Sequence, residues 1–252
     1  MHIGQRNQLT YQDPHLSSRN RMVTALSPID KNTLWDLAYS ELKKALLSGK
    51  FEPGQRIILR EIAGELGISL TPVRDAVNHL IAERVLDRGP GGQKGGASVP
   101  HLDAGQFQQL MFLRADLESR LAYAATANIS DTHIHKLEQL VEQMKKSIDK
   151  SNKNTYLDLH RRFHFSLYEH AHMDVVTDIT EILWLRCGPA LNAVLRDYVP
   201  NLKQTDHHSL TISGLHARNA MQVAQSIRND ITEAGEYIFE QLSKGASHPA
   251  GA

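Results

Sequence analysis

Residues 59–92 read LREIAGELGISLTPVRDAVNHLIAERVLDRGPGG, and this stretch decides the fold of the first half of the chain. Apolar residues recur at helical spacing up to Gly67, which is expected to end a first short helix. A second helix is predicted to begin at Thr71, with Thr71 as its N-cap and Pro72 at its first helical position. Two helices joined by a tight turn containing glycine are typical of a helix-turn-helix motif.

The sequence on either side of this motif completes a small domain. Leu34 to Ser48 carries an apolar stripe at helical spacing and ends at Gly49, before a Pro53-Gly54 turn. Residues 85–99 contain two short apolar segments around a glycine-rich turn, which predicts a β-hairpin. The order of these elements predicts a winged helix-turn-helix, a DNA-binding domain, over residues 34–100. Residues 1–33 are polar and lack apolar periodicity, so we expect a flexible N-terminal tail.

The second half of the chain has a different pattern. Long stretches of helical periodicity follow one another over residues 103–243, with no convincing strand and no repeat. The sequence therefore predicts a mainly α protein in which the winged domain precedes an all-α helical bundle. The expected helices span about 104–127, 131–151, 155–171, 175–199, 206–217 and 219–243.

Composition limits the class of protein without naming a partner. The 252 residues are enough for two domains, and 41% of them are hydrophobic, which suits globular cores. With 28 basic and 28 acidic residues, the net charge gives no support for nucleic-acid binding, so that case depends on particular side chains. Cys187 is the only cysteine, and we find neither a secretory signal nor an apolar run of about 18 residues. We expect a cytoplasmic protein without a membrane segment.

The N-terminal turn of the second motif helix is the predicted DNA-reading element. Its free backbone N–H groups and positive dipole end favour phosphate. Arg74 and Asn78 lie on its outward face, the hydroxyls of Ser69 and Thr71 flank its start, and Lys94 lies in the wing. The alternative is a structural helix pair with a solvated arginine.

Residues 59–92, together with YSELKKALLSGKFEPGQRI at 39–57, resemble the GntR family of bacterial transcription regulators. The resemblance implies operator contacts at the positions of Arg60, Ser69, Thr71 and Arg74. The family usually has an arginine directly before the Thr-Pro pair, where this chain has Leu70. A leucine cannot make the bidentate guanine contact of an arginine, but it can pack on a thymine methyl group.

The C-terminal half resembles the FCD branch of the same family through FLRADLESRLAYAAT at 112–126, LHRRFHFSLYEHA at 159–171 and DHHSL at 206–210. This resemblance implies a helical, ligand-binding domain that responds to a small organic acid. Many FCD domains also hold a divalent metal with one Asp and three His. On the family pattern His160 occupies the usual Asp position and Asp230 that of the fourth His, so the two residue types are exchanged here.

The spacing of these residues allows one shared site. His160 and His164 are four positions apart and share a helix face, although 14 histidines produce roughly one such pair by chance. His208 and Asp230 would be about 33 Å apart on one continuous helix, but a turn at Asn219, itself a good N-cap, would bring them level. The set of His160, His164, His208 and Asp230 suits Zn, Ni or Mn. Hydrogen bonding of these histidines within the bundle is the alternative.

Arg114 has two interpretations. It lies four positions before Glu118 on the same predicted helix, and an ion pair between them would be purely structural. The FCD resemblance instead implies an arginine that binds the carboxylate of the effector.

These predictions combine into a homodimeric repressor or activator that binds operator DNA and responds to a small organic acid, with a divalent metal in its helical domain. One alternative is a regulator for which the metal itself is the signal. Another is a helical metalloenzyme with a DNA-binding appendage, but the sequence contains no nucleophile–base motif, so we assign no catalytic residue.

Overall fold

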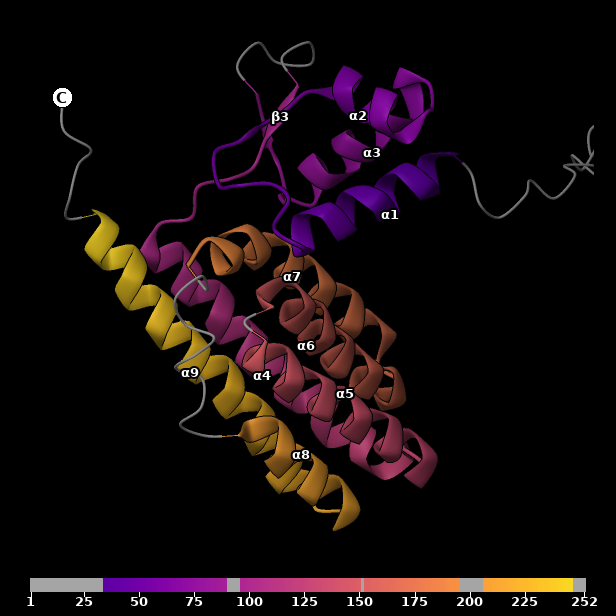
Figure 1. Ribbon diagram of the computed structural model, residues 1–252, viewed down its shortest axis with the longest axis vertical. Helices are drawn as coiled ribbons and strands as arrows, with labels where there is room; N and C mark the ends of the chain where they lie inside the picture. Colours follow the sequence, from indigo (N-terminus) through magenta and orange to yellow (C-terminus); the bar gives the residue numbers. More distant parts are fainter. Residues whose placement is uncertain (1–33, 90–95, 151, 195–205, 247–252) are drawn as a thin grey trace, which may run out of the picture. The chain divides into compact units, whose positions relative to one another are not determined.

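The computed structural model describes residues 34–89, 96–150, 152–194 and 206–246 (Figure 1). The predicted tail and Lys94 lie outside these ranges. The described part is mainly helical with one small sheet, as predicted. No helix in these ranges is long and apolar enough to cross a membrane.

Three helices and a three-stranded sheet form the winged helix-turn-helix. Its helices are α1 (Leu34–Leu47), α2 (Leu59–Leu66) and α3 (Leu70–Ala82), and its strands are β1 (Arg56–Ile57), β2 (Asp87–Arg88) and β3 (Ala97–Ser98). The order is β1-β3-β2, with both pairs antiparallel. The hairpin was predicted from sequence, but β1 was not, because a strand of two residues is too short to show alternation.

The start of α3 differs from the prediction. The helix begins at Leu70 with Ser69 as its N-cap, so the assignment of Thr71 as the N-cap was wrong. Pro72 is therefore the third helical residue. It is tolerated there because the first N–H groups of a helix have no acceptor within the helix. The buried face of α3 consists of Val73, Ala76, Val77 and Leu80.

The helical bundle follows the predicted order of elements. It comprises α4 (Ala104–Asn128), α5 (Asp131–Asp149), α6 (Lys153–Tyr168), the 3-10 helix η2 (Glu169–Ala171), α7 (Asp174–Val194), α8 (His207–His216) and α9 (Ala220–Ala246). α4 and α9 lie alongside each other (Figure 1). A capping box fixes the start of α4, where Asp103 Oδ1 accepts from the Gln106 amide at 2.7 Å.

The turn between α8 and α9 confirms the predicted hairpin. Asn219 Oδ1 accepts a hydrogen bond from the Gln222 amide at 3.1 Å, which caps the start of α9. Gly214 allows the two helices to approach closely, because a Cβ there would lie 2.8 Å from Val223 Cγ2. The hairpin thus brings the first turn of α8 level with the middle of α9.

Helix α7 also contacts the winged domain. Its Leu185 is buried in the same apolar cluster as the residues of α1 and α3. Asn192 Nδ2 donates to the Leu47 carbonyl at 3.1 Å, and Lys43 Nζ lies 2.5 Å from Glu181 Oε2. Gly49 takes a positive φ of 69° in this region, where any Cβ would lie 2.6 Å from Asn192 Cγ. The contact therefore combines apolar packing with a hydrogen bond and an ion pair.

Candidate metal centre and DNA-binding face

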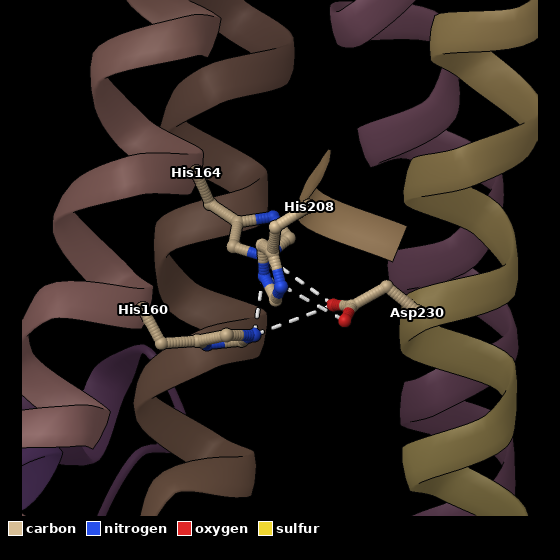
Figure 2. A group of neighbouring side chains, drawn as sticks. All are labelled: His160, His164, His208 and Asp230. Atoms are coloured by element: carbon tan, nitrogen blue, oxygen red, sulfur yellow. Dashed lines mark hydrogen bonds and ion pairs between the residues drawn. The ribbon is translucent and has the colours of Figure 1, made fainter. Parts of the chain in front are cut away.

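Four side chains from three helices converge inside the bundle (Figure 2). His160 and His164 project from successive turns of α6, His208 comes from the first turn of α8, and Asp230 comes from α9. One potential ligand atom from each lies within 4.8 Å of all the others. The structure therefore brings together the four residues that the sequence singled out. They form the sole group of this kind among the described residues.

The distances within this cluster suit a metal ion. Asp230 Oδ2 lies 3.3 Å from both His160 Nε2 and His164 Nε2, and those two nitrogens are 3.2 Å apart. His208 Nε2 lies 3.6 Å from Asp230 Oδ1. Two tetrahedral ligands about 2.0–2.1 Å from one ion are about 3.4 Å apart. One ion could therefore be bound with only small movements of these side chains.

Burial favours the neutral form of two imidazoles of the cluster, those of His160 and His208. Burial lowers the pKa of His208 to about 3. Burial, followed by the neighbouring His164, lowers the pKa of His160. Both rings are consequently neutral at neutral pH, the form that binds metal. Burial alone would raise the pKa of Asp230, but its imidazole neighbours, first His208 and then His160, outweigh this effect, so its pKa lies well below its usual range.

One nitrogen of the cluster lacks a conventional partner. His208 Nε2 is buried and has no hydrogen-bond partner among the described residues. A buried polar atom without a partner is costly, and a bound cation would remove that cost. Three imidazoles and one carboxylate therefore fit a divalent ion by their chemistry as well as by their spacing.

A second layer of polar side chains lies behind His164. Its Nδ1 is 2.8 Å from the Tyr168 hydroxyl, which donates to Glu118 Oε2 at 2.7 Å. Arg114 Nε in turn donates to Glu118 Oε1 at 2.7 Å. The structure thus contains the ion pair that the sequence offered as one interpretation of Arg114. Tyr168 was missed as a site residue, although its position one turn after His164 placed it on the same helix face.

The pKa values in this layer keep its charges in place. Burial alone would lower the pKa of Arg114, but the charge of Glu118, the neighbouring Cys187 and the hydrogen bond with Glu118 together outweigh burial and raise it. Burial and then the charge of Glu118 raise the pKa of Tyr168 well above its usual value. The phenol is therefore protonated at neutral pH and the guanidinium is charged.

Two pockets adjoin the cluster. One holds about 60 Å³ and touches His160 and Asp230, and its wall also includes Arg114, Trp184 and Leu47. The guanidinium of Arg114 stacks over the Trp184 ring at 4.0 Å from its centroid. Trp184 Nε1 is a buried donor without a partner in the described part of the chain. We call this space the arginine pocket.

The second pocket lies against the α8 side of the cluster. It holds about 440 Å³ and touches His208 and Asp230, with Lys145, His207 and Glu233 in its wall. His207 is not part of the cluster, and its Nε2 lies 2.9 Å from Glu233 Oε1. The cluster can therefore be approached from two sides.

The predicted DNA-reading residues gather on one face of the winged domain. Arg60, Leu70, Arg74 and Asn78 line one open hollow, and Ser69 and Thr71 are exposed beside it at the start of α3. Arg56 and Arg88 line the same hollow and were not singled out from the sequence. They lie on strands of two residues each, which are too short to be recognised from alternation in the sequence. This face carries four arginines, of which two come from α2 and α3 and two from the short strands, and such a basic face suits a phosphate backbone.

Comparison with known protein families matches both halves of the chain. The model of bacterial regulatory proteins of the gntR family matches residues 36–93, and the FCD domain model matches residues 109–233. The chain belongs to the GntR family, in its FCD branch. It is accordingly a DNA-binding transcription regulator.

Individual members of the GntR family resemble most of this chain. McbR of Escherichia coli strain K12 is 28% identical over 213 residues, which cover 81% of this chain and 92% of McbR. The Uxu operon regulator of Haemophilus influenzae is 26% identical over 217 residues, or 79% of each protein. Both are named as regulators. The solved structure of E. coli McbR has the same fold, with a TM-score of 0.75 at 23% identity over 83% of this chain and 99% of that one.

This GntR regulator is expected to read one operator base differently from relatives that carry arginine before the Thr-Pro pair. Leu70 is half-buried and lines the DNA-facing hollow. Leu70→Arg should shift the preferred base towards guanine at one position in each half-site, because arginine binds the O6 and N7 atoms of guanine. Selection from random duplexes measures the change. An identical consensus for both proteins would mean that residue 70 does not face a base.

Proposed function

We propose that this chain is a ligand-responsive regulator. In this proposal a small organic acid binds beside a divalent ion, Zn, Ni or Mn, and changes the affinity of the winged domain for its operator. The observation that carries the proposal is the convergence of His160, His164, His208 and Asp230 next to a pocket. A bound ion would supply an open coordination position for the carboxylate of the effector.

The DNA contacts of this proposal lie on α2 and α3 and, from the sequence alone, at Lys94 of the predicted wing. We assign base contacts to Arg74, Asn78 and Leu70, and backbone or groove contacts to Arg60, Ser69, Thr71 and Lys94. One recognition helix reads only a few base pairs, so a homodimer on two half-sites is expected. Sedimentation should show a dimer at micromolar concentration. A monomer with full affinity for a single half-site would contradict this expectation.

The chemistry of the arginine pocket favours a carboxylate. Arg114 uses its Nε for Glu118, and its Nη1 donates only to the weak acceptor Met111 Sδ, 3.8 Å away. Trp184 Nε1 lines the same pocket and is a buried donor that lacks a partner among the described residues. Donors of this kind are costly to leave unpaired and are matched by an anionic acceptor. We therefore propose that Arg114 contributes to effector binding through its Nη groups.

The arginine pocket also reaches the winged domain. Leu47 of α1 and Asn192 of α7 both line it, and Asn192 donates to the Leu47 carbonyl. An effector in the pocket would therefore contact groups that join α1 to α7. If the ligand and the operator favour different arrangements of this contact, each lowers the affinity for the other by the same factor.

Operator binding under defined metal and effector conditions tests the proposal. Fragments selected from genomic DNA would supply the operator. Its Kd would then be measured with metal-free protein, metal-loaded protein, and metal-loaded protein with each of a series of small organic acids. An active acid should change Kd by about 5- to 150-fold, and only in the loaded protein. His135→Ala, which removes an exposed histidine paired with Glu138, is the control and should respond like the unaltered protein.

Other outcomes separate the alternatives. If metal alone changes the Kd and no acid adds to it, the metal is the signal. If an acid is chemically converted, the helical domain is an enzyme. If neither metal nor any acid changes the Kd, the proposed control of DNA binding is wrong.

A further inference from the structure

The proton positions behind His164 can be worked out from one end of the network. Arg114, Glu118, Tyr168 and His164 are between 0% and 2% exposed, so no bulk water competes for their hydrogen bonds. Arg114 Nε donates to Glu118 Oε1 at 2.7 Å, and a carboxylate paired in this way accepts hydrogen bonds and donates none. The proton shared by Tyr168 and Glu118, whose oxygens are 2.7 Å apart, therefore belongs to the phenol.

This arrangement fixes the tautomer of His164. The single proton of Tyr168 is used by Glu118, so its oxygen can only accept from His164 Nδ1, which lies 2.8 Å away. A neutral imidazole carries one proton. That proton is consequently on Nδ1, and Nε2 presents a free lone pair towards His160 Nε2 and Asp230 Oδ2, at 3.2 and 3.3 Å.

We propose that Glu118 and Tyr168 are positioning residues for the metal centre. They hold the His164 ring in one orientation and keep its proton on the nitrogen that faces away from the ion. The inference rests on the proposed metal site, and it gives Arg114 a second role, which is to hold Glu118 as a hydrogen-bond acceptor for Tyr168. Partners of this kind orient ligating histidines and increase their basicity.

Tyr168→Phe tests this assignment because it removes one oxygen and leaves the ring in place. We expect Zn²⁺ affinity, measured against a competing chelator, to fall by about 10- to 100-fold. The matched control is Tyr39→Phe, which removes the hydrogen bond from Tyr39 Oη to Glu83 Oε2, 2.9 Å long, in the winged domain. Tyr39→Phe should bind Zn²⁺ as the unaltered protein does.

A second readout needs no metal. Long-range ¹H–¹⁵N correlation spectra of the metal-free, unaltered full-length protein should show the His164 proton on Nδ1, and Tyr168→Phe should allow it to move to Nε2. A proton on Nε2 in the unaltered protein would overturn the inference, as would full Zn²⁺ affinity in folded Tyr168→Phe. If the unaltered protein binds no ion while His164 carries its proton on Nδ1, the metal proposal fails and the tautomer assignment stands.

Discussion

The double variant His160→Asp with Asp230→His is expected to recover the metal that each single variant loses. The two side chains face each other from α6 and α9, with His160 Nε2 3.3 Å from Asp230 Oδ2. Exchanging them restores the arrangement that the FCD resemblance implies as usual. The effect is measured by elemental analysis, as the metal content of each variant after dialysis.

The lengths of the side chains explain why each single variant, His160→Asp or Asp230→His, should lose the metal. An imidazole places its Nε2 further from the backbone than an aspartate places its oxygens. His160→Asp alone leaves two short side chains and a gap, whereas Asp230→His alone directs two long ones at the same point. The double variant conserves the combined reach and the set of three imidazoles and one carboxylate.

His164→Ala and His208→Ala define the lowest metal content expected in this experiment. Each variant removes a ligand and should release most of the metal. The exposed His135 again provides a control, because His135→Ala should keep full occupancy. A double variant that holds no more metal than the worse single variant would show that residues 160 and 230 do not share an ion.

Arg74→Ala is expected to weaken operator binding by about 1–3 kcal/mol, or about 5- to 150-fold in Kd. Arg74 is exposed on the first turns of α3 and lines the DNA-facing hollow with Arg60. Because its side chain is exposed, helical content by circular dichroism should stay unchanged. Fluorescence anisotropy with the selected operator measures the loss.

The control for Arg74→Ala removes the same charge elsewhere. Arg162 is exposed on α6, and its Nη1 lies 3.9 Å from Asp158 Oδ2. Arg162→Ala should leave operator affinity unchanged. Arg60→Ala should add to the loss caused by Arg74→Ala. Intact specific binding in the combined Arg60 and Arg74 variant would mean that another element reads the DNA.

Local patterns were enough to predict the parts of the fold that depend on nearby residues. Gly67 ends α2 as expected, and Asn219 begins α9 as expected. Both rely on backbone conformations or caps that particular residue types prefer. The start of α3 was misplaced because Ser69 and Thr71 are both good N-cap residues, and sequence alone does not choose between them.

Some contacts of the candidate site could be predicted from the sequence, and others could not. The spacing around Asn219 predicted that His208 and Asp230 would be level, because a hairpin has a simple geometry. Tyr168 and Glu118 lie 50 positions apart, and their hydrogen bond depends on how α6 packs against α4. No periodicity encodes that contact. Arg56 and Arg88 were missed for a similar reason, since β1 and β2 meet only through β3.

Anomalous diffraction from crystals of the unaltered protein, recorded at the absorption edge of its metal, tests the account most directly. We expect one peak per chain about 2.0–2.2 Å from an imidazole nitrogen of each of His160, His164 and His208 and from a carboxylate oxygen of Asp230. Two results would contradict it. One is the absence of a peak among these residues after saturation with Zn²⁺, Ni²⁺ and Mn²⁺ in turn, and the other is a metal peak elsewhere in the bundle.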